Sequence, residues 1–549
     1  MLWHILILPL ALALPQVRND HSSTCRFAPS FTLSDIRADP EAFAKQVARA
    51  EGAFHADGIG YNQANGMTYD GTSLNYTTGL VNTTGLHPFS AASKESLQLM
   101  MYAKVLSGDP LAAVWLRPDG DVEQAKDEVI GILKTKLQVL GRFNQTFPGF
   151  GGLLPWFYSN ETDLRPTWDW VDRIPALDNG EMLWAAYAVV AAMEDCARDD
   201  WKEVQSGWQE WLDYTKTTAA KLFYHGEGRV CAVVRLNQSL HVDDPGQNIT
   251  CEGSPPGLLD DPYEGELFTW WLYFFAPQLS DQDRELLWTT KRAKLQLTEY
   301  TGSVVDTADS ATPLVVNYTG RSVVTPLPGG QSITVQKGFW FSAHEQWKLL
   351  EMPYLDNKLV YRLFHNAERA RTCDAFLSSN PGMFASVNNV TNLTTLDLEG
   401  YISPAGIPSI SFNQAQELDM ITPYATFPTM LFDRATGLAW YKNMLDGPKM
   451  QNPYGSTESV RRDGTAVSAL VTWDSKITTL VAILGGVGDL VGAKMRRDGV
   501  YDSFMTVLQR EYAMVFGENG EKIKGEDVEL CWPKAAVPLD IPDFTSCSA

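Results

Sequence analysis

The sequence predicts an all-α fold dominated by an (α/α)6 barrel, a toroid with a few short β-hairpins in its loops. Helices that are apolar on every side alternate along the chain with helices that carry a single apolar stripe, which fits an inner and an outer layer. Hydrophobic residues make up 44% of the 549 residues, enough for a large core. No fixed sequence period supports the alternative of an α-solenoid. Because no long flexible linker is visible, residues 14–549 are predicted to form one domain.

The elements before residue 150 include one clear outer helix. Residues 40–54 predict a first helix, and residues 91–106 predict another. Between them, residues 55–90 are rich in Gly, Asn and Thr and are predicted to be an exposed loop or short hairpins. In residues 121–140 apolar side chains recur at steps of three and four, which predicts a helix with one buried stripe.

The alternation of buried and amphipathic helices is clearest after residue 178. Residues 178–181 form a helix start signal, and the next twelve residues carry no charge, so this helix must be covered on all sides. Residues 203–223 are amphipathic again. The same pairing predicts helices over 265–276 with 281–297, 339–351 with 356–372, 420–432 with 434–444, and 476–484 with 498–511. Strands are predicted from β-branched runs near 229–235, 312–336 and 466–473.

The N-terminus predicts secretion. A short apolar run in residues 1–13 ends in Ala11-Leu12-Ala13, the pattern of a signal peptide, although its charged first region is missing. No later apolar run is long enough to span a bilayer, so no membrane partner is expected. A high density of glycosylation sequons agrees with an extracellular protein: they stand at Asn75, Asn82, Asn144, Asn160, Asn237, Asn248, Asn317, Asn389 and Asn392.

The seven cysteines predict disulfides rather than a metal site, because none has the spacing of zinc ligands. Cys231 and Cys251 flank a polar loop and are predicted to pair. An odd number of cysteines leaves one thiol over. No metal cluster, phosphate-binding glycine loop or Ser-His-Asp set is visible, so no cofactor is expected.

Charge and composition narrow the class of partner. The formal net charge is -22 and the pI is near 4.8, so the chain repels phosphate backbones and nucleic acid is not expected to bind. The 17 tryptophans suit sites that stack on sugar rings, although plain packing accounts for most of them. A monomer is expected.

Two carboxylates stand where a turn runs into a wholly apolar helix. Pro262 and Gly265 mark the turn, and Glu264 and Glu266 lie in and just after it. Partial loss of water at such a place raises the pKa of a carboxyl group, as a general acid working near neutral pH requires. The alternative is that both residues only cap the helix.

Four polar and aromatic loops precede buried helices and are predicted to gather at one end of the barrel. Their carboxylates, amides and indole faces are the usual materials of a sugar site. The tryptophans could instead be core residues, Asp178 could be a helix cap, and His344 a structural histidine. The candidate substrate-binding residues are Trp156, Trp170, Asp178, Tyr263, Glu266, Trp271, His344, Trp347, Tyr401 and Tyr424.

Four motifs together resemble the fungal endo-β-1,2-glucanases of glycoside hydrolase family 162 and, more distantly, the bacterial β-1,2-glucanases of family 144. The resemblance runs from about residue 90 to the C-terminus, and each motif alone is weak. The motifs are Leu177-Asp178-Asn179-Gly180-Glu181, Tyr263-Glu264-Gly265-Glu266, Ile421-Thr422-Pro423-Tyr424-Ala425 and Tyr441-Lys442-Asn443-Met444-Leu445-Asp446-Gly447.

The resemblance implies an (α/α)6 barrel that hydrolyses linear β-1,2-glucan to short sophoro-oligosaccharides with inversion. It implies Glu264 as a general acid acting through a substrate hydroxyl, and Asp446 as a general base acting along a water chain. Glu266, two residues away, is the alternative acid. Asp446 precedes Gly447-Pro448, where a turn-forming role is the plain alternative. Two other functions stay open: a glycosidase or polysaccharide lyase of another linkage, and a carbohydrate-binding toroid without catalysis.

Overall fold

The computed structural model describes residues 26–306, 315–316, 322–536 and 544. The predicted signal peptide, the sequon at Asn317 and two cysteines, Cys25 and Cys547, lie outside these residues. The extent of the domain over residues 14–549 stays a prediction.

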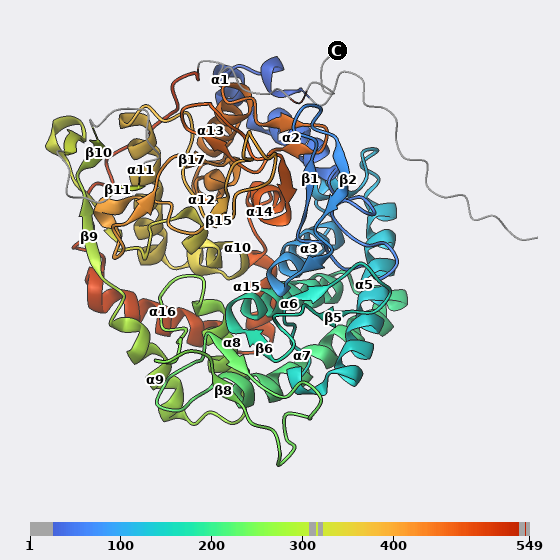
Figure 1. Ribbon diagram of the computed structural model, residues 1–549. Helices are drawn as coiled ribbons and strands as arrows, with labels where there is room; N and C mark the ends of the chain where they lie inside the picture. Colours follow the sequence, from blue (N-terminus) through green and yellow to red (C-terminus); the bar gives the residue numbers. More distant parts are fainter. Residues whose placement is uncertain (1–25, 307–314, 317–321, 537–543, 545–549) are drawn as a thin grey trace, which may run out of the picture.

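Six helical segments form an inner ring, and they lie near the centre of the view in Figure 1. Within the ring α3 packs on α6 and α14, α6 packs on α8, and α14 packs on α12. Two segments begin with a 3-10 turn, which continues into a short α-helix. The ring consists of α3 (Ala92–Leu106), α6 (Ala176–Cys196), α8 (Glu266–Phe275), η5 (Ala343–Gln346) with α10 (Lys348–Glu351), η8 (Pro423–Thr426) with α12 (Phe427–Phe432), and α14 (Trp473–Ile483).

The remaining α-helices surround this ring, as Figure 1 shows for α5, α7, α9, α11 and α13. Every residue of α3 is buried, whereas α5 buries only one stripe, so the two layers follow the two hydrophobic patterns. The predicted (α/α)6 barrel is confirmed. The outer helices are α1 (Leu33–Ala38), α2 (Pro40–Gly52), α4 (Pro110–Leu116), α5 (Val122–Thr146), α7 (Lys202–Phe223), α9 (Asp281–Arg292), α11 (Lys358–Leu377), α13 (Arg434–Asp446), α15 (Gly488–Arg497) and α16 (Tyr501–Phe516).

Side-chain caps occur in both layers but not at every helix, and in the inner ring Thr472 caps α14. Asp121, Ser280 and Asn357 cap α5, α9 and α11 with side-chain oxygens that accept backbone N–H bonds. The inner helices α3, α6 and α8 have no side-chain cap. The polar side chains near the starts of these inner helices are therefore free for other partners.

The strands are short and lie in the loops between helices, as predicted. The predicted runs near 229–235, 312–336 and 466–473 contain β7, β11 to β13 and β21. The strands are β1 (Gly71–Leu74), β2 (Val81–Leu86), β3 (Phe89–Ser90), β4 (Phe157–Tyr158), β5 (Arg165–Pro166), β6 (Arg173–Pro175), β7 (Val233–Arg235), β8 (Thr250–Cys251), β9 (Leu297–Tyr300), β10 (Gly302–Asp306), β11 (Val315–Val316), β12 (Ser322–Pro326), β13 (Ile333–Gln336), β14 (Val387–Asn388), β15 (Tyr401–Ile402), β16 (Gln416–Glu417), β17 (Met420–Ile421), β18 (Gln451–Asn452), β19 (Gly455–Ser456), β20 (Val460–Arg461) and β21 (Leu470–Thr472).

One sheet joins the two ends of the chain. Strand β1 pairs antiparallel with β2 on one side and with β21, almost 400 residues later, on the other. Residues 65–69, just before β1, are buried as well. The prediction of an exposed loop or short hairpins over residues 55–90 is confirmed for the hairpin of β1 and β2. It is wrong about the exposure of residues 65–69 and of β1, because β1 also pairs with β21.

The described cysteines form two disulfides. Cys231 and Cys251 are bonded, which confirms the predicted pair. A second bond joins Cys373 of α11 to Cys531, 158 residues later, and no local pattern in the sequence predicts it. Among the described cysteines, Cys196 is free.

The sequons that the structure describes differ in exposure. Asn75, Asn82, Asn160, Asn237 and Asn248 are exposed, which suits modification. The other three, Asn144, Asn389 and Asn392, are half-buried.

Within the described residues no single helix has the length and apolar composition of a membrane span. The pair α14 and α15 passes that test only when both are taken together, across a bend of 70°. Helix α14 belongs to the buried inner ring.

Candidate active site

Five polar side chains gather where the inner helices begin. Lys94, Asp178 and Asp474 stand in the first three residues of α3, α6 and α14. His344 is the second residue of η5, and Glu264 lies two residues before α8. Helices that run in the same direction around a ring bring their first turns to one end, so these side chains share one end of the barrel.

Lys94 links two of these helices. Its Nζ lies 2.9 Å from a carboxylate oxygen of Asp474 and 3.8 Å from one of Asp70. Burial opposes its charge, but the carboxylates of Asp474, Asp70 and Asp178 together raise the pKa of Lys94. The ammonium group also lies 5.2 Å from the centre of the Trp156 ring. Charge and aromatic surface therefore meet at this side of the site.

Asp178 lies across from Lys94 and is half-buried. It accepts hydrogen bonds from Ser93 and from the indole of Trp156, and both bonds favour its charged form. Burial outweighs them and Lys94, and it raises the pKa of Asp178. Asp178 therefore lies together with Lys94 and Trp156, and its role in binding substrate stays a prediction.

Glu264 has the environment of a proton donor. Its side chain is 15% exposed, and Oε2 has no hydrogen-bond partner among the described residues. Burial raises the pKa of Glu264 well above its ordinary value, and the charges of Asp261, Glu345 and Asp178 raise it further. Both effects favour the protonated form of the carboxyl group, which a general acid needs.

His344 is the nearest titratable neighbour of this carboxyl. Its Nε2 lies 3.6 Å from Oε2 of Glu264. Burial lowers the pKa of His344 to about 4, so the ring is neutral at pH 7 and does not draw the proton from Glu264 as a cation would. Nδ1 of His344 has no hydrogen-bond partner among the described residues. It is available to a bound hydroxyl group.

Glu266, the alternative acid, has a structural role. It is 2% exposed, and its Oε2 accepts hydrogen bonds from Nζ of Lys348 at 2.7 Å and from the hydroxyl of Tyr354 at 2.6 Å. A carboxylate held by a buried ammonium group cannot readily give a proton to a substrate. Of the two candidates, the geometry favours Glu264.

Asp446 lies away from this group of side chains. It is the last residue of the outer helix α13, its side chain is 38% exposed, and it pairs with Lys442 at 2.7 Å. The charges that act on Glu264 come instead from Asp261, Glu345 and Asp178. The role of Asp446 as a base stays a prediction. The residues that follow, 450–459, are almost all buried, so this segment packs inside the protein.

The predicted aromatic residues divide into exposed and buried sets. Trp156 and Trp170 are half-buried, and Tyr401 is 52% exposed, so their rings can reach a ligand. Trp271 and Trp347 are at most 1% exposed, and Trp271 packs against Trp184 and Phe275. Direct sugar stacking on Trp271 and Trp347 is therefore a wrong prediction, because their helices bury them from all sides.

Two predicted tyrosines are also buried. Tyr263 is 6% exposed and donates its hydroxyl hydrogen to the backbone oxygen of Lys337. Tyr424 is 1% exposed at the start of the inner segment η8. Both side chains pack inside the protein, and neither offers its ring to a ligand in this structure.

Sequence reasoning missed several charged residues of the site. Lys94 and Asp474 were not singled out, although both follow directly on the start of a buried helix, where a charge is uncommon. Glu181 is 1% exposed, and neither of its oxygens has a hydrogen-bond partner among the described residues. Burial and the charges of Asp178, Glu351 and Glu264 raise the pKa of Glu181. A charge within the first six residues of a helix that is buried on every side is the signal that could have found these residues.

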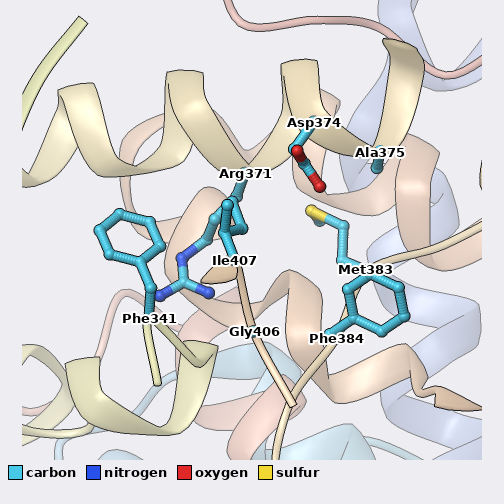
Figure 2. Close-up of a pocket in the computed structure, with 8 residues that line it drawn as sticks. All are labelled: Phe341, Arg371, Asp374, Ala375, Met383, Phe384, Gly406 and Ile407. Carbon is cyan, nitrogen blue, oxygen red and sulfur yellow. The ribbon is translucent and has the colours of Figure 1, made fainter. Parts of the chain in front are cut away.

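A pocket beneath the outer helix α11 is separate from this site. Figure 2 shows Arg371 and Asp374 projecting from one helix toward Met383 and Phe341. Arg371 is paired with Glu368 at 3.1 Å, and Asp374 accepts a hydrogen bond from Tyr300 at 3.2 Å. The lining does not include Glu264, Asp178 or Asp474. We interpret the pocket as part of the packing under α11.

The Asp374 carboxyl predicts a pH-dependent stability. Burial raises its pKa to about 6 from the usual 3.8, so the folded protein keeps this proton after the unfolded chain has lost it. The folded state therefore loses stability as the pH rises from about 4 to about 6. Asp374→Asn removes this loss, so we expect the variant to gain about 1–3 kcal/mol relative to the wild type across that range. Urea unfolding at several pH values measures the difference. A difference that is constant with pH would contradict the prediction.

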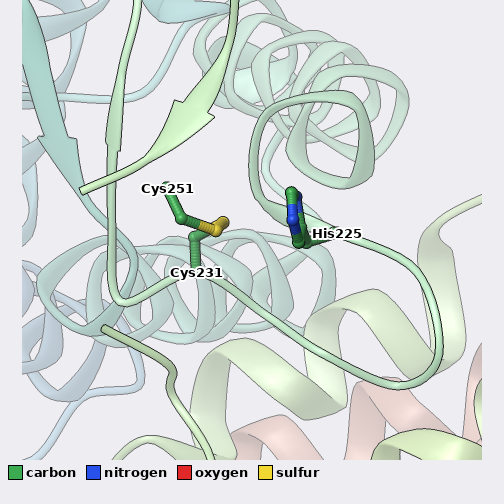
Figure 3. A group of neighbouring side chains, drawn as sticks. All are labelled: His225, Cys231 and Cys251. Atoms are coloured by element: carbon green, nitrogen blue, oxygen red, sulfur yellow. A yellow bond between two sulfur atoms is a disulfide. The ribbon is translucent and has the colours of Figure 1, made fainter. Parts of the chain in front are cut away.

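One described group of potential metal donors lies close together, formed by His225, Cys231 and Cys251. Figure 3 shows that the two sulfur atoms are bonded to each other beside the imidazole ring. A disulfide has no thiolate to offer a metal ion. This group therefore does not form a thiolate metal site while the disulfide is intact.

The class of protein follows from two features. The helices form a double ring, and one end of that ring carries a carboxyl group with a raised pKa, further acidic side chains and accessible aromatic rings. These are the components of a glycoside hydrolase built on an (α/α)6 barrel.

The chain belongs to glycoside hydrolase family 162, whose profile is described as endo-β-1,2-glucanase SGL and matches residues 67–310 and 322–548. This confirms the family that the four motifs resemble. A search of curated proteins finds no match.

Solved structures place the chain beside two groups of enzymes. The endo-β-1,2-glucanase of Talaromyces funiculosus in complex with sophorose is 51% identical, with a TM-score of 0.87, and the match covers 96% of this chain and 100% of that one. A glutamate-to-glutamine mutant of the same enzyme, in complex with β-1,2-glucan, matches at 51% identity and a TM-score of 0.87, over 95% of this chain and 99% of that one. The endo-β-1,2-glucanase of Chitinophaga pinensis is 11% identical, with a TM-score of 0.52 and coverage of 84% and 96%. It supports the fold alone.

Proposed function

We propose that this protein is a secreted endo-β-1,2-glucanase that cuts linear β-1,2-glucan into sophoro-oligosaccharides with inversion at the anomeric carbon. The observation that carries the proposal is the largely buried carboxyl group of Glu264 in a chain of this family: its Oε2 has no hydrogen-bond partner among the described residues, and burial raises its pKa. The relative from Talaromyces funiculosus, 51% identical, was solved with sophorose and with β-1,2-glucan. Secretion is supported by the N-terminal signal pattern, the sequons and two disulfides.

In the proposed reaction Glu264 supplies the proton that the leaving sugar oxygen needs, by way of a substrate hydroxyl. A carboxylate base takes a proton from the attacking water on the opposite face of the sugar. Nε2 of His344 lies 3.6 Å from Oε2 of Glu264. Because the pKa of His344 is lowered to about 4, the ring is neutral and does not lower the pKa of Glu264 as a positive charge would. Lys94 pairs with Asp474 at 2.9 Å, and its charge opposes the rise that burial causes in the pKa of Asp178.

The base has three candidate positions. The motif resemblance implies Asp446, whereas the geometry adds Asp178 and Asp474, which lie at the starts of inner helices with Glu264. Separate Asp→Asn variants at the three positions distinguish them. The variant of the base should lose about 10²–10⁴-fold in kcat with little change in KM, and the other two should lose less.

The substrate is tested with a panel of linear β-1,2-, β-1,3- and β-1,4-glucans, with the products sized by chromatography. We expect short oligosaccharides from the β-1,2-linked polymer alone, released early from the interior of the chain. Cleavage of another polymer, with no release from the β-1,2-linked one, would overturn the proposed substrate. Binding without cleavage would favour a carbohydrate-binding toroid.

The stereochemistry is tested by following the first-formed anomer with NMR or polarimetry. Inversion at a β-linkage should yield the α-anomer first, because a single displacement by water exchanges the face of the sugar ring. A β-anomer formed first would overturn the single-displacement mechanism and the need for a separate base.

A further inference from the structure

Trp168 presents its indole ring to solvent beside the site. Its side chain is 80% exposed, whereas nine other tryptophans among the described residues are less than 2% exposed. A tryptophan this exposed does not contribute the free energy of folding that burial of its ring would supply. Folding stability therefore does not explain why tryptophan stands at this position. Val171, 41% exposed, extends the same apolar surface.

The turn that carries Trp168 is firmly held. The backbone N–H of Trp170 donates to the carbonyl oxygen of Thr167 at 2.9 Å, and the Thr167 hydroxyl donates to Asp169 at 2.9 Å. Arg173 donates to the carbonyl oxygen of Asp169 and lies over the Trp170 ring. The exposed ring therefore stands on a rigid base, so little conformational entropy is lost when a ligand stacks on it.

The same turn is tied directly to the candidate active site. The N–H of Thr167 donates to the carbonyl oxygen of Trp156 at 3.0 Å. The indole of Trp156 in turn donates to Asp178, and its ring faces Lys94. Trp168 thus follows directly on Thr167, whose backbone is hydrogen-bonded to Trp156 of the site. Trp168 itself is not one of the titratable groups near Glu264.

We propose that Trp168 is a stacking platform for a glucose unit of the polymer that lies outside the catalytic site, and that it favours long chains as substrates. The flat face of an indole matches the C–H face of a pyranose ring, and its lack of charge suits a neutral polysaccharide. This inference rests on the proposed function, since it takes the occupant to be a segment of the same glucan chain that is cut.

The test compares long β-1,2-glucan with oligosaccharides too short to reach beyond the catalytic site. Trp168→Ala should raise KM for the polymer about tenfold, with kcat unchanged and with unchanged kinetics on the short substrates. Trp168→Phe should restore most of the loss, because an aromatic face remains. Met514→Ala, at a residue that is 53% exposed on the outer helix α16, is the matched control and should change nothing.

Three results would overturn the platform. They are equal KM values for wild type and Trp168→Ala on the polymer, equal losses on long and short substrates, and a Trp168-dependent self-association that sedimentation detects without glucan. A wild type inactive on β-1,2-glucan would instead refute the proposed function. Gel-retardation binding of β-1,2-, β-1,3- and β-1,4-glucans would then test Trp168 by itself, and equal retardation of wild type and Trp168→Ala in all three would overturn it.

Discussion

Glu264→Gln is expected to lower kcat on β-1,2-glucan by about 10³-fold while leaving the fold intact. Burial raises the pKa of Glu264 well above its ordinary value, which favours the protonated carboxyl group, and glutamine copies the shape of that neutral form. The melting temperature should therefore stay close to that of the wild type. Glutamine cannot transfer the proton, so the loss should fall on kcat rather than on KM.

Glu266→Gln is the matched control for this variant. It removes the charge that faces the buried Lys348, so any loss of activity should come with a lower melting temperature. If Glu264→Gln kept near wild-type turnover, and Glu266→Gln were inactive but fully folded, the acid would be Glu266.

The pH profile gives an independent check on the same residue. The acid works only while protonated, so activity should fall as the pH rises past the raised pKa of Glu264. The charge of Asp178 helps to raise that pKa. Asp178→Asn should therefore lower the pKa of Glu264 and move the alkaline limb of the profile to lower pH. A limb that stays in place would show that another group controls it.

The sequence predicted the ring of helices because hydrophobic periodicity is a property of each helix by itself. The uncharged run after Glu181 predicted α6 as an inner helix, and the apolar stripe of residues 121–140 predicted α5 as an outer one. The predicted helix over 339–351 proved to be a 3-10 turn followed by the single turn of α10. Periodicity could not show this break, because both conformations bury the same side chains.

The site was predicted only in part, since it depends on contacts between distant residues. The Pro-Gly turn marked Glu264 locally. Lys94 and Asp474 lie 380 residues apart in the sequence, and the ion pair that brings them together is visible only in the fold. Trp271 was misplaced for the same reason, since the sequence does not show which face of an all-apolar helix is open. Its aromatic neighbours, Trp184 and Phe275, show that its own face is closed.

The second large effect is expected at Lys348, which closes the inner ring. This residue is fully buried on α10, and its Nζ donates to Glu266 at 2.7 Å, to the carbonyl oxygen of Pro262 at 2.9 Å and to the hydroxyl of Tyr512 at 3.1 Å. These partners belong to α8, to the turn that holds Glu264 and to the outer helix α16. One ammonium group therefore ties three parts of the barrel together.

Lys348→Met should cost about 3–5 kcal/mol of unfolding free energy, because it leaves the Glu266 carboxylate buried without a positive charge. Lys134→Met, which breaks an ion pair with side chains 49% and 78% exposed, is the control and should cost less than about 1 kcal/mol. Adding Glu266→Gln to Lys348→Met should return part of the loss, since the unpaired charge is then gone. Urea unfolding of the three variants and the wild type measures these differences. Equal costs for Lys348→Met and Lys134→Met would show that the buried pair does not hold the ring closed.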